Sequence, residues 1–196
     1  IPAPENKDSA KTPMLADLTR YYDEARRFAR MMTERSMESY GKQNVIVTGG
    51  GPGVMEAGNR GASEAGGQSI GLNIVLPHEQ APNQYVTPDL SFNFHYFAIR
   101  KMHFLMRAAA VCVFPGGFGT LDEMFEMLTW RQLGLGKKPC AFLDVNGFWQ
   151  PLMAMLDTMV RERFLHAEQR VDLWHGSDID TLLTWMRAYV PAQADK

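Results

Sequence analysis

The chain has 196 residues, of which 45% are hydrophobic, and its formal net charge is -2 at pH 7. This size and apolar content suit one α/β domain with a sizeable core, without a second domain. Charges of both signs are interspersed and no dense block of Lys and Arg occurs, which argues against nucleic acid or an anionic membrane as a partner. We therefore expect a small-molecule ligand.

No apolar run approaches the roughly 18 residues that a membrane span requires, and residues 1–13 are polar and contain proline, unlike a signal peptide. Cys112 and Cys140 each lie within an apolar run that predicts a buried strand, which indicates reduced packing residues rather than a disulfide or a metal pair. We expect a cytoplasmic protein with one folded domain over residues 14–190, and with flexible tails at residues 1–13 and 191–196.

The first predicted element is a helix over residues 14–40, where apolar side chains recur at spacings of three and four. A short buried strand, Val45–Val47, follows it. The strand leads into the glycine-rich turn Thr48–Gly53, and this turn opens a predicted helix over residues 54–65. Because ligands bind at the carboxyl ends of the strands of a parallel sheet, the turn is a candidate ligand site.

Gly50 and Gly51 lie at the centre of this turn, but the turn lacks the dinucleotide fingerprint. Val54 occupies the position of the third glycine of G-x-G-x-x-G, and the next predicted strand, Ser69–Val75, offers Asn73 in place of an acidic residue for the ribose. The sequence also contains no G-x-x-x-x-G-K-[ST] phosphate loop. The phosphates expected here are those of a mononucleotide or a sugar phosphate.

Residues 77–93 form a predicted loop rich in Pro, Asn and Gln, which carries Glu79 and is long enough to be a functional rim. A helix is predicted over residues 94–109. It brings four basic or titratable side chains close together, namely Arg100, Lys101, His103 and Arg107. They can form a solvated or salt-bridged stripe, or they can face the ligand, and the pattern alone leaves both interpretations open.

The most informative stretch is Phe114-Pro-Gly-Gly-Phe-Gly-Thr-Leu-Asp-Glu123, which lies between a buried apolar strand and an amphipathic helix. Gly116, Gly117 and Gly119 permit positive φ and a close approach of the backbone to a ligand. The helix that opens near Thr120 offers free N–H groups and the positive end of its dipole, which together favour a bound phosphate.

Glu123 has two interpretations at this stage. The run Thr120-Leu-Asp-Glu123 fits a capping box, in which the Thr hydroxyl and the Glu carboxylate satisfy free N–H groups at the helix start, worth about 1 kcal/mol. A carboxylate in this place also repels phosphate, so the second interpretation is that Glu123 acts on another part of a phosphorylated ligand.

The remaining elements continue the alternation of strands and helices. They are a strand over Cys140–Leu143, a helix over residues 148–164, a strand over Val171–Trp174 and a helix that Asp178 caps and that ends near Tyr189. Alternating elements with short links form parallel sheets through right-handed crossovers. The predicted fold class is therefore α/β: a doubly wound, Rossmann-like parallel sheet flanked by helices, in a single domain.

Three motifs carry a resemblance to a known family. The run Pro115–Glu123, preceded by Arg100-Lys101 and by Gly49–Glu56, resembles the Lonely Guy (LOG) family of phosphoribohydrolases, long mislabelled as lysine decarboxylases. The resemblance covers about residues 21–189. It implies hydrolysis of the N-glycosidic bond of adenosine 5′-monophosphate (AMP) or of a cytokinin riboside 5′-monophosphate by a homodimer, without a metal or another cofactor.

The resemblance also assigns roles to individual residues. Arg100 and Glu123 match the catalytic pair of the family. Glu79 aligns with a substrate-binding glutamate, and the backbone from Gly116 to Thr120 would hold the 5′-phosphate. The residues assigned to substrate binding are Glu79, Lys101, Gly116, Gly117, Gly119, Thr120 and Thr129, together with Gly50 and Gly51 of the first turn.

A mechanism follows from this assignment as a hypothesis. Cleavage of the bond between base and ribose builds positive charge on the sugar ring, which a carboxylate beneath the ring stabilises while it accepts a proton from the attacking water. Glu123 is the candidate for that carboxylate. Arg100 would orient the nucleotide through its rigid fork of donors.

The sequence departs from the family pattern at its start, where the usual first strand with its Gly-Ser turn is not visible. The run Phe92–Phe97 resembles the bacterial branch of the family, which favours plain AMP over a prenylated adenine. The contact surface of the expected homodimer could include this aromatic run and the helix that carries Trp130, although both could equally belong to the core.

Two alternatives belong to other functional classes. A nucleotide or molybdenum-cofactor carrier or sensor of the same fold would need the glycine turns but not the pair of Arg100 and Glu123. A lysine decarboxylase would need pyridoxal phosphate on a Schiff-base lysine, and Lys101 is the only lysine near the motif.

Overall fold

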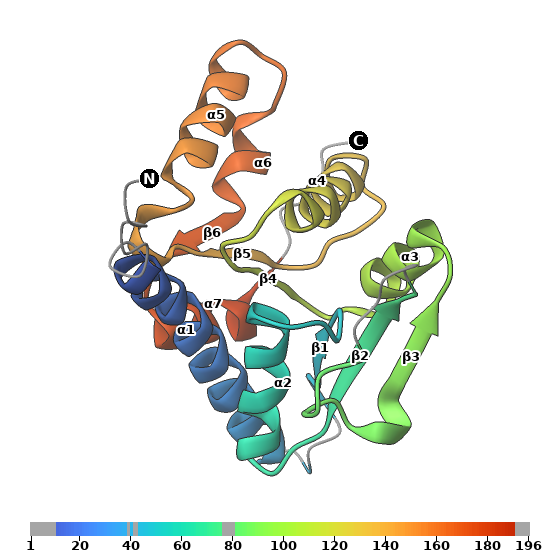
Figure 1. The fold of residues 1–196 in the computed structure, drawn as a ribbon. Coiled ribbons are helices and arrows are strands. Elements are labelled where there is room, and N and C mark those ends of the chain that lie inside the picture. Colours follow the sequence, from blue (N-terminus) through green and yellow to red (C-terminus); the bar gives the residue numbers. More distant parts are fainter. Residues whose placement is uncertain (1–10, 39, 41–42, 76–80, 191–196) are drawn as a thin grey trace, which may run out of the picture.

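A computed structural model describes residues 11–38, 40, 43–75 and 81–190 of the chain (Figure 1). The first helix begins at Lys11, within the segment that the sequence predicted as an N-terminal tail. The rest of that tail and the predicted tail at residues 191–196 lie outside the described residues. Strands and helices alternate along most of the chain, as predicted.

The first half of the chain supplies the elements drawn in blue to green in Figure 1. In chain order they are α1 (Lys11–Met37), β1 (Ile46–Thr48), α2 (Val54–Glu64), β2 (Ser69–Ile74), the 3-10 turn η1 (Pro88–Leu90), β3 (Ser91–Phe94) and α3 (Phe97–Arg107).

The second half supplies the remaining elements. They are β4 (Val111–Val113), α4 (Phe118–Gln132), β5 (Cys140–Leu143), the 3-10 turn η2 (Val145–Gly147), α5 (Gln150–Arg161), α6 (Ala167–Val171), β6 (Leu173–Gly176) and α7 (Ile179–Ala188). The side chain of Asp178 accepts the backbone N–H of Thr181, so Asp178 caps α7 as predicted.

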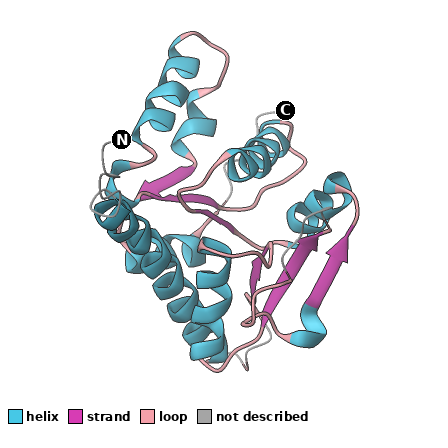
Figure 2. Cartoon of the chain, viewed as in Figure 1, coloured by secondary structure: helices cyan, strands magenta, loops and turns pink. Residues whose placement is uncertain are grey.

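The described strands form two three-stranded sheets, ordered β1-β2-β3 and β4-β5-β6, and every pairing in them is parallel. These orders are the two halves of a doubly wound arrangement, and helices lie on either side of the strands (Figure 2). The predicted fold class is confirmed. Among the described strands, β1 pairs only with β2 and β4 only with β5, so no backbone ladder joins the two halves.

The core lies on both faces of β5, whose four residues are all buried, as is typical of a parallel strand covered on both sides. Cys140 and Phe142 face a cluster built mainly by α4 and α5, which includes Met124 and Trp149. The opposite face packs against α1 and α7. Its buried members are Phe28, Ala141, Leu143, Val145, Ile179, Leu182 and Leu183.

Cys112 and Cys140 are free thiols on neighbouring strands, which confirms their prediction as reduced packing residues. Burial raises the pKa of the Cys140 thiol to about 12 and also raises that of Cys112, so both stay protonated at neutral pH.

Strand β3 corrects the sequence analysis, which placed a loop up to residue 93 and a helix from residue 94. Residues Ser91–Phe94 instead pair with β2, and α3 begins only at Phe97. The strand is short, has a single partner among the described strands and contains Asn93, so its composition resembles that of a loop although its residues alternate in polarity.

The last strand is also displaced from its predicted place. It covers Leu173–Gly176 rather than Val171–Trp174, because Val171 ends the short helix α6. The Gln169 side chain accepts the backbone N–H of His166 at the start of that helix, which stabilises a turn that the sequence analysis did not anticipate.

No helix within the described residues combines the length and the apolar character needed to cross a bilayer. In the same part of the chain, no three His, Cys, Asp or Glu side chains converge as a metal ion would require.

Candidate active site

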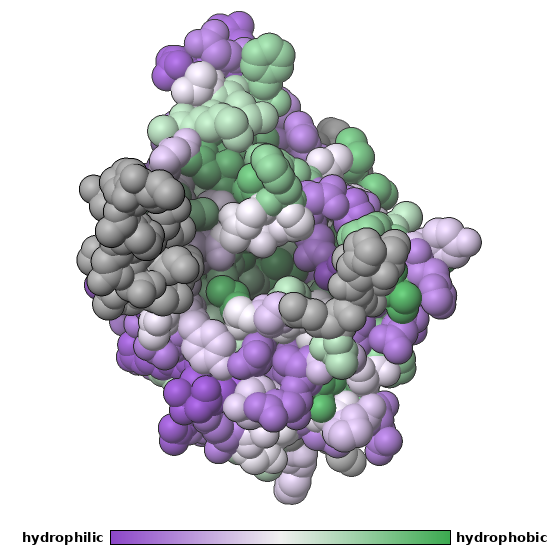
Figure 3. Space-filling view, viewed as in Figure 1, coloured by the Kyte–Doolittle hydropathy of each residue, from purple (hydrophilic) through white to green (hydrophobic). Residues whose placement is uncertain are grey.

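The two glycine-rich turns lie at the N-terminal ends of α2 and α4, where the halves of the molecule face each other (Figure 1). On this face the surface is hollowed, and apolar residues lie in the hollow (Figure 3). Ion pairs of Arg100 and Lys101 on α3 with acidic residues of α4 connect the two halves.

Helix α4 begins at Phe118, with Gly117 as its N-cap and without any side-chain cap. Thr120 therefore lies inside the first turn, and Glu123 lies in the second. The capping-box interpretation of Thr120 and Glu123 is wrong, because the helix starts before Thr120 and Glu123 satisfies no N–H group at its start. This result leaves the Glu123 carboxylate free for another role.

The second glycine turn is open to a ligand. None of Gly116, Gly117 and Gly119 adopts the positive φ that the sequence permits. A Cβ at Gly116 would lie 2.2 Å from the Thr120 hydroxyl oxygen, whereas a Cβ at Gly117 or Gly119 would meet no atom of the described residues within 4 Å. The first N–H groups of α4 have no partner inside the helix and carry the positive end of its dipole, so this open turn suits a phosphate.

Arg100 and Glu123 form an ion pair beside this turn, with 3.2 Å between Nη2 and Oε1. The Arg100 side chain is 11% exposed and that of Glu123 is 35% exposed. Arg100 Nε donates to the carbonyl of Leu72, within β2, at 2.8 Å, and the guanidinium lies 5.5 Å from the ring centroid of Phe104. The guanidinium is therefore fixed in place before any ligand arrives.

Burial raises the pKa of the Glu123 carboxyl, and the neighbouring charge of Asp122 acts in the same direction. Arg100 and Lys101 lower the pKa, but the net shift is upward. A carboxylate with a raised pKa accepts protons more readily, which is the property that a general base near neutral pH needs.

Lys101 extends from α3 to the acidic face of α4. Its ammonium lies 3.1 Å from the Asp122 carboxylate and 2.6 Å from that of Glu126. Hydrogen bonds to Glu126 and Asp122 raise the pKa of Lys101, so the amine stays protonated. A Schiff base requires a neutral amine, and Lys101 therefore does not fit the role of a pyridoxal phosphate lysine.

The other predicted site residues are more dispersed. The Thr129 hydroxyl donates to the Phe125 carbonyl at 2.8 Å and lies on the exposed side of α4, beyond Glu123. His103 packs on Phe94, with ring centroids 5.1 Å apart, rather than beside the Arg100–Glu123 pair. Glu79 lies outside the described residues.

The first glycine turn is closely packed, in contrast to the second. Gly50 has φ of 72°, and a Cβ there would lie 1.8 Å from Oδ1 of Asn73. Asn73 also donates to the Ser91 hydroxyl at 3.0 Å, so it fills the space beside the turn and is not available to a ribose. A Cβ at Gly49 would lie 2.8 Å from Arg100 Nη2, which brings the turn directly behind the guanidinium.

Sequence reasoning missed four contributors to this arrangement: Gly49, Leu72, Asn83 and Phe104. Phe104 follows Arg100 by four residues on the predicted helix, and that spacing is a signal that could have identified it. Leu72 acts through its carbonyl and Asn83 through a contact with a turn more than 30 residues away, so neither has a local signal.

A family model and a curated relative both relate the chain to the same family. A family model described as possible lysine decarboxylase matches residues 55–186. The cytokinin riboside 5′-monophosphate phosphoribohydrolase LOG2 of Arabidopsis thaliana is 28% identical over 179 residues, which is 90% of this chain and 80% of that protein.

Two solved structures share the fold. The X-ray structure of a Northeast Structural Genomics Consortium target has a TM-score of 0.61 and 22% identity, covering 88% of this chain and 90% of that one. The molybdenum cofactor binding protein of Rippkaea orientalis has a TM-score of 0.57 and 23% identity, covering 88% and 86% of the two chains.

Proposed function

Because the chain belongs to the Lonely Guy (LOG) family, which the possible lysine decarboxylase model describes, we propose that it hydrolyses the N-glycosidic bond of a nucleoside 5′-monophosphate. The products are the free base and ribose 5-phosphate. AMP is the substrate we favour, and a cytokinin riboside 5′-monophosphate, the substrate class in the name of the Arabidopsis relative, is the second candidate.

The observation that carries this proposal is the Arg100–Glu123 pair next to an open glycine turn. The 5′-phosphate binds the backbone from Gly116 to Thr120, at the start of α4. The ribose then extends toward Glu123, one helical turn further along. The order of groups on the ligand, phosphate and then sugar, thus follows the order of groups on α4.

Glu123 supplies the chemistry in this proposal. As the bond to the base breaks, positive charge develops on the sugar ring, and the carboxylate stabilises it. The carboxylate also accepts a proton from the water that attacks the sugar carbon, while the departing base takes up a proton. Arg100 orients the nucleotide and holds Glu123 in place through the existing ion pair.

Further residues support binding in the same scheme. Lys101, Gly50, Gly51, Thr129 and Glu79 remain proposed substrate contacts, and Lys101 would have to exchange a carboxylate of α4 for the ligand. We propose no metal and no other cofactor. The free thiols fit the cytoplasm as the compartment.

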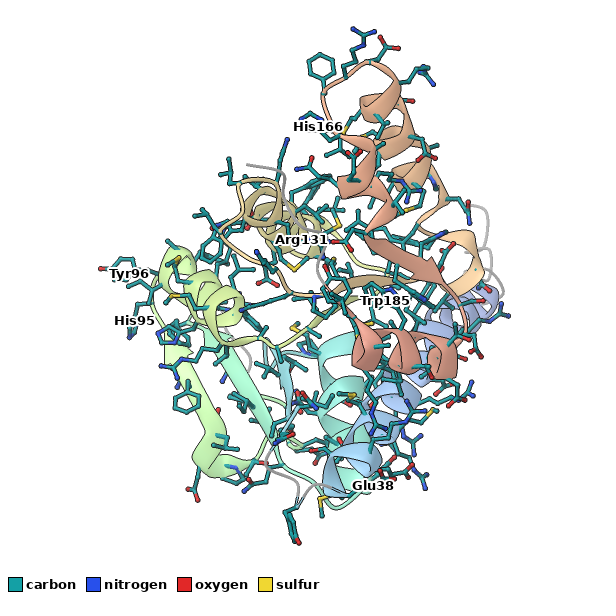
Figure 4. The ribbon with its side chains drawn as sticks, turned by 180° about the vertical axis from the view of Figure 1, so that it is seen from behind. Glu38, His95, Tyr96, Arg131, His166 and Trp185 are labelled. Atoms are coloured by element: carbon teal, nitrogen blue, oxygen red, sulfur yellow. The ribbon has the colours of Figure 1, made fainter. Side chains whose placement is uncertain are left out.

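We also propose that the protein is a homodimer that associates through α3. Only Leu105 of this helix is buried, while its apolar residues Phe97, Ile99, Met102 and Met106 are exposed. His95 and Tyr96 project outward at the same end of the molecule (Figure 4), and Tyr96 is 70% exposed. Met106→Glu is expected to convert a dimer to a monomer in light scattering, whereas a monomeric wild-type protein would contradict the proposal.

The test of the activity compares nucleotides with a nucleoside. Purified protein is incubated with AMP, with other nucleoside 5′-monophosphates and with adenosine, and free base is followed by chromatography. We expect adenine from AMP but not from adenosine, and loss of the activity in Glu123→Gln. Glu162→Gln, the same change at the exposed end of α5, is the matched control and should leave turnover unchanged.

Release of no base from any nucleotide would contradict the proposal. It would favour the carrier or sensor alternative, in which the glycine turns bind a ligand and the Arg100–Glu123 pair has no catalytic role.

A further inference from the structure

The segment after residue 80 folds back over the first glycine turn and binds it through Asn83. The Asn83 side-chain amide donates to the carbonyls of Gly50 and Gly51, at 3.0 and 3.1 Å. Its backbone N–H donates to the Gly50 carbonyl as well, at 2.8 Å. Both carbonyls of the turn are thus held by one residue from a distant part of the chain.

Asn83 is itself fixed by a buried polar network. Its amide also donates to Oδ1 of Asn59, at 2.9 Å, and Asn59 has 0% exposure. Asn59 in turn accepts the Thr48 hydroxyl at 2.7 Å and donates to the Ser69 hydroxyl at 3.0 Å. In such a network the loss of one member leaves buried partners unsatisfied, so the arrangement is kept as a unit.

The turn that Asn83 holds forms the wall behind Arg100. Gly49 lies so close that a Cβ on it would be 2.8 Å from Arg100 Nη2. The same Nη2 lies 3.2 Å from Glu123 Oε1. A shift of the turn therefore either presses on the guanidinium or leaves a gap behind it, and in both cases the Arg100–Glu123 geometry changes.

We infer that Asn83 is a positioning residue for the proposed reaction: by fixing the Gly50 and Gly51 carbonyls it sets the place of Arg100 opposite Glu123. Asn83 touches neither Arg100 nor Glu123 in any hydrogen bond or ion pair of the described residues. The effect on kcat that we expect from this inference rests on the proposed function. The effect on the position of Arg100 does not.

Asn83→Asp is the sharpest variant. It keeps the size of the side chain but replaces the amide donor with a carboxylate that faces two carbonyls, so the turn must move. We expect kcat with AMP to fall about 10- to 100-fold, as for a displacement of catalytic groups by about 1 Å, with a much smaller change in KM. Asn83→Ala introduces no repulsion and should give a smaller loss of kcat. It replaces Asn83→Asp as the test if the Asp variant folds poorly.

Thr87→Val is the matched control from the same segment. It removes the hydroxyl that accepts the Ser69 N–H at 3.0 Å, so it loosens the segment without touching the glycine turn. We expect a loss of thermal stability comparable to that of Asn83→Ala, with kcat within about twofold of wild type. Equal losses of kcat in the Thr87 and Asn83 variants would overturn the inference, since Asn83 would then act only through stability.

A spectroscopic measurement separates this inference from the proposed function. The Arg100 Nε–H, which donates to the Leu72 carbonyl, should give a protected side-chain signal in ¹⁵N NMR spectra of the wild type. We expect the signal to shift or broaden in both Asn83 variants and to persist in Thr87→Val. An unchanged signal in the Asn83 variants would refute the positioning role, even in an active enzyme. If no nucleotide is hydrolysed, the proposed function fails, but this spectrum still decides the inference.

Discussion

The two glycine turns have similar sequences and opposite environments. In the first, Gly49, Gly50 and Gly51 are surrounded by side chains, and Asn83 binds two of its carbonyls. In the second, Gly117 and Gly119 border open space. Glycine is thus required at Gly50 by the protein's own packing, and at Gly117 and Gly119 by the space that we propose for the ligand.

This difference indicates how the candidate active site is divided between the two halves of the molecule. The first turn is a rigid support for Arg100, and the second is the proposed phosphate site beside Glu123. Four predictions test this division, and they begin with the largest expected effect.

Gly50→Ala should be the most damaging change. It combines positive φ, which costs an L-residue roughly 1–2 kcal/mol, with a Cβ only 1.8 Å from Asn73 Oδ1. We expect the free energy of unfolding in urea to fall by about 3 kcal/mol or more. Gly50→Ala combined with Asn73→Ala should recover part of the loss, because the clash is relieved and the strain remains. Wild-type stability of the single variant would show that the first turn is not rigid.

Gly119→Ala should affect stability and binding in opposite directions. Gly119 lies within α4, where Ala is the better helix former, and no atom obstructs its Cβ. We expect a gain of about 0.5 kcal/mol in the free energy of unfolding, with AMP bound about 10-fold more weakly in calorimetry. Unchanged affinity for AMP would remove the second turn from the binding site.

Acid should inactivate the enzyme at a higher pH than an ordinary carboxyl would require. The pKa of Glu123 is raised above 4.5. As the pH falls, the carboxyl therefore takes up a proton before the pH reaches 4.5, and the protonated carboxyl cannot act as a base. We expect the acid limb of kcat/KM, which reports the free enzyme, to lie above 4.5. AMP binding to Glu123→Gln over the same pH range corrects for titration of the substrate phosphate. A limb at or below that value would show that another group is the base.

Lys101→Met should lower stability only slightly. It removes two ion pairs between α3 and α4, and the carboxylates involved are partly exposed and screened by salt. We expect a loss of less than about 1 kcal/mol, which shrinks as salt is added. A large loss of AMP affinity in the same variant would support a direct role of Lys101 in binding.

The sequence was most informative where local chemistry decides the structure. The alternation of elements, both glycine turns, the free thiols and the Asp178 cap were predicted correctly, since each depends on neighbouring residues. Strand β3 was missed because its pairing with β2, and not its composition, makes it a strand.

The site was predicted less completely than the fold. Arg100 and Glu123 do meet, but the start of α4 was placed too late, and the capping box at Thr120 failed as a result. The support of Arg100 by Leu72 and Gly49, and the role of Asn83, depend on contacts between segments that fold back on each other. Spacing along the chain cannot show such contacts.

The separation of the described strands into two sheets has a consequence for amide hydrogen exchange. Among the described strands, β2 and β5 are bonded on both sides, whereas β1 and β4, which lie where the halves meet, are bonded on one side only. We therefore expect exchange to be slowest within each half and faster at the boundary between them. Arg100 is anchored to one half and Glu123 belongs to the other, so their ion pair reports whether the two halves are docked.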